Sequence, residues 1–350
     1  MEKKYKNRMG MFDFIRGIAI FFVVIMHTIC YWGEEQQVLG PIFALLYQTH
    51  RFWMPVFLMI SGYWFSAKDI KDYTRKRFVG FVKSYLKIGV AATICYAIIH
   101  YCRFHSVRAT TKGSIGVMLA FLFGSKEPLS VGPLTIYDVG PAWFLVVLCL
   151  GDILLNIILN IQRIHNKFFA VATLAIVGLF VGKLPWVPFC MSTTLVSVLG
   201  LYIGYELKRS KYLISVWKLR DYIGVILLSG VGICIMGISY FKSADLEILA
   251  DLPGAILLLR LGLYLEKKQN RVIDFFKRMG RYTLWILMVH TVEMLSFDWR
   301  ILKNTEYVSA HPWVGVFGIF ILRWIVIIIG CLFISAMGKM LERRKRDESI

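Results

Sequence analysis

The sequence predicts an all-α integral membrane protein, a bundle of about ten transmembrane helices with the N-terminus and the C-terminus in the cytoplasm. Three observations lead to this prediction. Hydrophobic residues make up 57% of the chain and charged residues only 18%, too few to cover a soluble domain of 350 residues. Apolar runs of roughly 17 to 25 residues, the length that crosses a bilayer core, recur along the whole chain. The basic residues lie mainly in the short loops between these runs.

Ten apolar segments are expected to cross the membrane as helices. Their order along the chain is 12–32, 42–65, 78–100, 140–161, 168–183, 190–207, 222–241, 248–265, 282–297 and 313–338. The long stretch 101–139 contains a further apolar piece at 115–123, which is too short to span and is expected to be re-entrant or interfacial. No polar stretch is long enough for a separate soluble domain, so residues 1–350 are expected to form a single transmembrane domain.

The net charge of +19 comes mainly from basic residues in the loops between the apolar segments. With the N-terminus inside, the cytoplasmic segments hold 27 of the 41 lysines and arginines, more than three times as many as the outside loops. This bias is the pattern of the positive-inside rule for a multi-pass protein of the cytoplasmic (inner) membrane. The positive charge is therefore explained by the orientation of the chain in the membrane. Membrane lipid is an expected partner, and binding to nucleic acid is not expected.

The first segment contains ionisable residues, which are costly inside a membrane and therefore indicate function. Arg16 and His27 are eleven residues apart, which places them about 20° from each other around a helix and roughly 16 Å apart along it. Asp13 precedes Arg16 by three residues and can pair with it. One interpretation is structural: Arg16 reaches lipid phosphates and His27 packs between helices. The other is that a cation at the inner face holds an anionic cofactor such as coenzyme A, whose long arm reaches the histidine.

The same segment resembles the opening signature of the acyltransferase-3 family of membrane O-acyltransferases: an Asp, then Arg-Gly, an apolar run and a His. Three later stretches are similar to family segments in the same order: Met54-Pro55-Val56-Phe57 with Ser61-Gly62-Tyr63, Gly140-Pro141-Ala142-Trp143-Phe144-Leu145, and Leu284-Trp285-Ile286-Leu287-Met288-Val289-His290. These matches are collinear and extend over most of the chain.

The resemblance implies an enzyme that moves an acetyl or other short acyl group from cytoplasmic acetyl-CoA, or a related acyl-CoA, to a hydroxyl of an extracytoplasmic glycan or lipid-linked sugar. This is the chemistry of polysaccharide O-acetylation. His27 would act as general base or carry the acyl group itself. Arg16, with Asp13 beside it, would hold the donor or stabilise the developing negative charge.

The family often carries Arg-x-x-Arg at the start of the third span, where the motif is implicated in handling the donor. Here Arg75 and Arg77 are the candidates for donor binding, but Gly80 stands where the second arginine would follow Arg77. Lys83, one turn further on, could substitute as a cation. Lysine is a flexible point charge and does not reproduce the planar fork of arginine.

Five further residues are candidates for substrate binding. His290 and Glu293 are three apart on one helix face and could pair with each other. Arg51 either reaches outward to solvent or faces a polar acceptor, and Ser61 either bonds a substrate hydroxyl or packs between helices. Trp143 stands where aromatic belts place tryptophan by default, and stacking on a sugar ring is the functional alternative.

Two further interpretations concern metal and transport. The histidines and carboxylates are scattered and the cysteines form no Cys-x-x-Cys pair, so no metal site is expected. The alternative to an enzyme is a transporter or exporter of a small polar molecule or glycan precursor, a role that the resemblance tolerates. The sequence contains no signal for an oligomeric state.

Overall fold

A computed structural model of the chain describes residues 10–32, 40–41, 46, 49–163, 166–237, 243–268 and 270–347. Its helices are α1 (Gly10–Ile29), α3 (His50–Trp64), α4 (Ile70–Phe104), α5 (Val107–Phe123), α6 (Trp143–Asn160), α7 (Lys167–Val181), α8 (Met191–Arg209), α9 (Leu219–Gly237), α10 (Ala244–Ala250), α11 (Leu252–Glu266), α12 (Arg271–Arg281), α13 (Thr283–Ser296), α14 (Arg300–Lys303), α15 (Glu306–Ala310) and α16 (Pro312–Asp347). Short 3-10 turns are η2 (Gly140–Ala142), η3 (Pro188–Cys190) and η4 (Tyr212–Ile214). The predicted all-α class is confirmed apart from one small antiparallel hairpin, in which β1 (Leu129–Val131) pairs with β2 (Leu134–Ile136) and Ser130 lies opposite Thr135.

A helix coincides with each of the ten predicted spans, but the helices differ in length. Six described helices are long and apolar enough to cross a membrane: Gly10–Trp32, Ile70–Phe104, Gly140–Asn160, Pro188–Arg209, Leu219–Met236 and Pro312–Met337. A seventh crossing results if α10 and α11, bent by 53°, are one broken span. α3, α7 and α13 have 15, 15 and 14 residues, fewer than the roughly 20 that a straight crossing needs. The chain is thus a multi-pass helical membrane protein, while ten full crossings and cytoplasmic termini stay predictions.

Part of the second predicted span, 42–65, lies outside the described residues, which resume continuously at 49. α5 begins eight residues before the apolar piece predicted at 115–123 and packs against α4. Phe121 of α5 contacts Tyr85 of α4, with ring centroids 5.2 Å apart. The position of this piece relative to a bilayer stays a prediction.

The break between α10 and α11 is stabilised by a proline and an ion pair. Pro253 lies in the first turn of α11, where its missing N–H is harmless but where a continuous helix from α10 would lose a hydrogen bond. Asp251 stands at the break, only 1% exposed, and accepts from Arg51 Nε at 2.8 Å and Nη2 at 3.0 Å. Arg51 therefore faces a polar acceptor, as one of its two interpretations expected, and ties the start of α3 to the break.

Several helices present large apolar side chains outward. Leu227 of α9 and Leu332 of α16 are 64% and 65% exposed. A surface of this kind is an aggregation hazard in water and is expected where helices face lipid. Part of the largest buried cluster lies between α3, α6 and α8, where Leu58, Val147 and Leu201 are fully buried.

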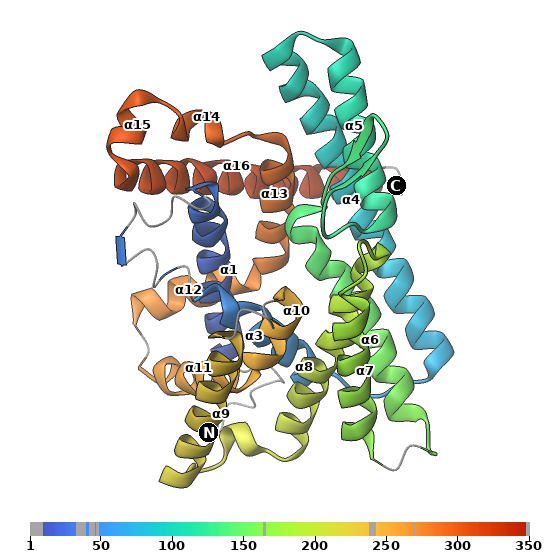
Figure 1. Ribbon diagram of the computed structural model, residues 1–350, viewed down its shortest axis with the longest axis vertical. Coiled ribbons are helices and arrows are strands. Elements are labelled where there is room, and N and C mark those ends of the chain that lie inside the picture. The colour runs from blue at the N-terminus through green and yellow to red at the C-terminus, as the bar shows by residue number, and fades with distance from the viewer. Residues whose placement is uncertain are drawn as a thin grey trace.

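The helices fall into two groups in space, one formed by α4, α6, α7 and α8 and one formed by α1, α12, α13 and α16 (Figure 1). α4, α6, α7 and α8 run along the long axis of the molecule as neighbours, with α5 and the hairpin at the upper end of α4. α1 runs in the same general direction and packs most extensively on α12. α16 crosses α1 steeply and also packs against α13. The crossing brings α1, α13 and α16 together at one point.

Glycines bring two helix pairs into backbone contact. A Cβ on Gly17 of α1 would collide with the carbonyl oxygen of Phe276 in α12, and one on Gly280 of α12 would collide with the carbonyl oxygen of Asp13. Gly62 of α3 meets the backbone of α8 in the same way. Small residues at such crossings allow close approach inside membranes. The Arg-Gly pair at positions 16 and 17 thus has a structural reason for its glycine.

Candidate functional site

Arg16 and His27 line the same cavity, as their spacing along one helix face predicts. The cavity has a volume of about 390 Å³, within the range of small-molecule sites, and lies between α1, α3, α6, α12 and α13. Its lining is mainly apolar and aromatic and consists of Arg16, Ile20, Val23, Met26, His27, Cys30, Trp53, Met54, Phe57, Pro141, Trp143, Phe144, Leu145, Leu148, Gly280, Arg281, Thr283, Leu284 and Leu287. We refer to this space as the first cavity.

Two arginines line the first cavity. Arg16 Nη1 lies 3.9 Å from Asp13 Oδ1, so the predicted pairing across one turn is present. The second arginine, Arg281, ends α12 and is exposed. Sequence reasoning missed Arg281, because it closes a run of basic residues that the positive-inside rule already explains. Its neighbour Gly280 packs on the α1 backbone, and this contact brings Arg281 to the cavity.

Trp143 also lines the first cavity, at the start of α6. The ammonium of Lys126 lies 5.4 Å from the centre of the Trp143 ring. The same ammonium donates to Thr193 at 2.8 Å and to Asp245 at 3.0 Å. The indole is therefore held in place by a charge that is itself anchored, and it presents an aromatic wall to the cavity.

His27 lies beside a second histidine. The ring centroids of His27 and His290 are 5.3 Å apart, with the planes inclined at 51°. His290 is fully buried, and its Nδ1 lies 2.7 Å from Glu293 Oε1. The predicted pairing of these two residues of α13 is therefore present. The Nε2 atom of His290 is buried and has no hydrogen-bond partner among the described residues.

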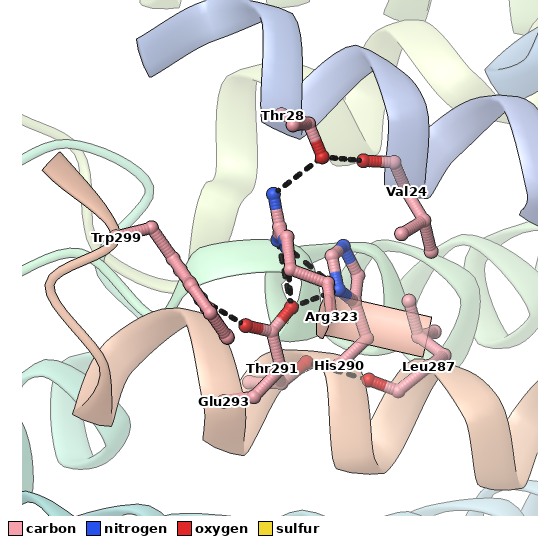
Figure 2. A network of polar contacts seen from close by, with 8 residues as sticks. All are labelled: Val24, Thr28, Leu287, His290, Thr291, Glu293, Trp299 and Arg323. Atoms are coloured by element: carbon pink, nitrogen blue, oxygen red, sulfur yellow. Dashed lines mark hydrogen bonds and ion pairs between the residues drawn. The ribbon is translucent and has the colours of Figure 1, made fainter. Parts of the chain in front are cut away.

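Arg323 of α16 completes a buried polar network around Glu293 (Figure 2). Its Nε and Nη2 donate to Glu293 Oε1 at 2.9 and 2.7 Å, and its Nη1 donates to Thr28 Oγ1 at 3.2 Å. Trp299 Nε1 donates to the other carboxylate oxygen at 2.6 Å. Arg323 and Glu293 are 0% and 1% exposed, so their charges neutralise each other away from solvent.

The network lies where α16 crosses α1 and α13, and its hydrogen bonds connect the three helices. Sequence reasoning did not single out Arg323. The signal that could have found it is the one that identified Arg16: an ionisable residue inside a predicted span, here 313–338.

The remaining predicted site residues lie elsewhere. Arg77 of α4 pairs with the buried Asp152 of α6, and Ser61 lies near the same carboxylate. Arg75 and Lys83 are exposed on α4. None of the following predicted site residues lines the first cavity: Arg51, Ser61, Arg75, Arg77 and Lys83. The structure thus brings together Asp13, Arg16, Trp143 and His27 with His290 and Glu293, and separates them from the proposed Arg75–Lys83 donor site.

Comparison with known proteins gives one match. A family model described as an acyltransferase domain matches residues 10–338, nearly the whole chain and every residue of the cavity and network. No curated protein and no solved structure gives a significant match.

Proposed function

Because the chain belongs to the acyltransferase-3 family, we propose that it moves an acetyl or other short acyl group from cytoplasmic acyl-CoA to a hydroxyl of an extracytoplasmic glycan. Membrane acyltransferase activity follows from the family. The donor, the acceptor, the roles of individual residues and the inner-membrane location are the parts proposed here.

The observation that supports this proposal is the single cavity shared by Arg16 and His27. The two residues stand roughly 16 Å apart along α1, a separation suited to a donor with phosphates at one end and a thioester at the end of a thin arm. The walls between them are mainly apolar, which would limit the water around a bound thioester and slow its hydrolysis.

Two cations at the Arg16 end suit the phosphates of coenzyme A. Guanidinium groups form bidentate charge-assisted hydrogen bonds with phosphate, and both Arg16 and Arg281 line the cavity. Because Arg16 is far from His27 along the helix, holding the donor fits it better than stabilising charge at the thioester. Arg75, Arg77 and Lys83 could contact the donor only outside the first cavity.

His27 carries the chemical step. As a general base, its imidazole takes the proton of the acceptor hydroxyl while the hydroxyl oxygen bonds to the thioester carbonyl carbon. The carbon–sulfur bond breaks, and the proton passes to the coenzyme A thiolate. As an acyl carrier, the imidazole nitrogen would instead attack the thioester carbonyl carbon and release the coenzyme A thiolate. The acceptor hydroxyl would then attack the acyl-imidazole, so that the acyl group moves to the hydroxyl oxygen and the hydroxyl proton passes to the freed imidazole nitrogen.

The buried network positions His27. Glu293 accepts from His290, Arg323 fixes Glu293, and the His290 ring packs beside His27. A histidine whose neighbour is held rigidly keeps one ring orientation, and such supporting contacts determine the efficiency of a catalytic group. His290 and Glu293 are therefore assigned to positioning rather than to direct substrate contact.

The proposal is tested with purified protein, acetyl-CoA and envelope glycan from a strain that lacks the protein. The expected result is release of free CoA that depends on the glycan, together with new ester groups on the glycan. If the glycan gains no ester and CoA release is independent of it, the glycan is not the acceptor, and the transporter alternative for the glycan is favoured.

A further inference from the structure

A second cavity of about 520 Å³ lies between the C-terminal end of α4 and the segment that joins α13 to α14. We call it the second cavity. It is found at the end of α1 opposite to Arg16: Tyr31 lines it, whereas His27 and Cys30 line the first cavity. Tyr31 follows His27 by four positions, on the 3-10 turn that continues α1, which places it roughly 7 Å further along the helix axis.

The wall between the cavities is formed by the polar network and its two aromatic neighbours. Trp299 lines the second cavity while its indole N–H reaches Glu293 (Figure 2). The Tyr31 ring lies over the Arg323 guanidinium, with 5.4 Å between ring centre and Cζ. Each of these rings therefore contacts the buried charges on one side and lines the second cavity.

The second cavity combines aromatic faces with polar groups. Besides Tyr31 and Trp299, its lining includes Tyr96, Tyr137 and Phe104. Aromatic rings with a polar tip suit a ligand that is apolar on its faces and polar at its edges, and a sugar ring has this form. The faces carry C–H groups and the edges carry hydroxyls.

Polar groups of the second cavity include an ion pair and a buried hydroxyl. Arg103 Nη1 donates to Asp298 Oδ2 at 2.9 Å across the cavity, and the two side chains remain 39% and 45% exposed. Ser296 is only 8% exposed, lines the cavity, and its Oγ has no hydrogen-bond partner among the described residues. A buried hydroxyl without a partner is unfavourable, and a ligand hydroxyl that bonds to it would remove that cost.

We propose that the second cavity binds the acceptor, a carbohydrate chain. Tyr31 and Trp299 stand between this site and His27, and the reacting sugar hydroxyl passes between them to reach His27. The inference rests on the proposed function, because it takes the acceptor to be a glycan. An aromatic belt at a membrane surface is the competing explanation for the tyrosines and tryptophan. It explains neither the unpartnered Ser296 hydroxyl nor the ion pair across the cavity.

The test uses full-length protein in the cell that makes it, so the sugar need not be known beforehand. Phe104 lines the second cavity and is 50% exposed, and it is replaced by the photo-crosslinking residue p-benzoylphenylalanine. The matched control is Tyr264, an aromatic that is 62% exposed in a different cavity beside Trp217. After irradiation, the protein is purified under denaturing conditions, hydrolysed in acid and analysed for monosaccharides.

Monosaccharides are expected from the position 104 sample and not from the position 264 sample. Equal amounts from both, or none from either, would overturn the proposal and leave the aromatic belt as the explanation. Kinetics provide a second readout. Ser296→Ala should raise the acceptor KM roughly 3- to 10-fold, the effect of one neutral hydrogen bond, and leave the donor KM unchanged. A rise confined to the donor KM would also contradict the site.

These outcomes distinguish the site from the proposed function. If sugar is crosslinked but the protein does not acylate it, the sugar site is supported and the proposed function is contradicted. Acyl transfer without crosslinked sugar would leave the enzyme and move the acceptor elsewhere.

Discussion

Replacing Arg323 by methionine tests whether the buried network stabilises the meeting of α1, α13 and α16. Methionine is also long and unbranched, but it donates none of the hydrogen bonds that Arg323 makes to Glu293 and Thr28. The Glu293 carboxylate would stay buried with its charge unbalanced. Removing one partner of a buried ion pair costs about 3–5 kcal/mol, a large share of the roughly 5–15 kcal/mol by which folded proteins are stable.

The double variant provides the decisive comparison. Glu293→Gln alone leaves the Arg323 charge without its partner and should also cost about 3–5 kcal/mol. Combining it with Arg323→Met removes both charges, while the amide oxygen of the introduced glutamine can still accept from Trp299. The double variant should therefore be more stable than the sum of the single effects by about 2–3 kcal/mol.

The measurement is the free energy of unfolding in detergent micelles, followed by tryptophan fluorescence. Arg209→Met is the control, since Arg209 is 71% exposed in its pair with Glu206 and should cost less than about 1 kcal/mol. Costs for Arg323→Met no larger than the control, or strictly additive effects in the double variant, would refute the role assigned to the network.

Two further predictions concern helix contact and donor binding. Gly17→Ala places a methyl group against the α12 backbone and should lower the free energy of unfolding by about 1–3 kcal/mol. Gly80→Ala is the control: nothing lies within 4 Å of an added Cβ, so the change should be neutral or stabilise by about 0.5–1 kcal/mol. Equal unfolding midpoints for the two variants would contradict the close packing of α1 on α12. Arg281→Ala should raise the donor KM more than the acceptor KM. The double change of Arg75 and Arg77 to alanine, predicted from the sequence to weaken donor binding, is measured beside it, and the larger donor effect locates the phosphates.

The fold class and part of the site could be predicted from sequence because they depend on local periodicity. Hydropathy located a helix at every predicted span, and the eleven-residue spacing placed Arg16 and His27 on one cavity. The i, i+3 spacing predicted the pairing of His290 with Glu293. Each of these inferences needs only the geometry of a single helix.

The features that were missed depend on contacts between distant segments. Arg323 bonds Thr28 across 295 positions, and Arg281 reaches the first cavity only because α12 packs on α1. The break between α10 and α11 was missed for a related reason. Hydropathy counts apolar residues, but it does not register that Asp251 and Pro253 divide one apolar run into two helices.

The most direct test of the account is acyl transfer by His27 variants. Proton abstraction by a positioned base contributes about 10² to 10⁴-fold in rate. His27→Ala and His27→Gln should therefore both lose glycan-dependent CoA release by at least about 100-fold, while each inserts in the membrane and unfolds like the unaltered protein. Glutamine keeps much of the size and some hydrogen bonding of histidine but cannot serve as the base. Near-normal acyl transfer by His27→Gln would show that His27 only packs between helices, and would contradict the proposed mechanism.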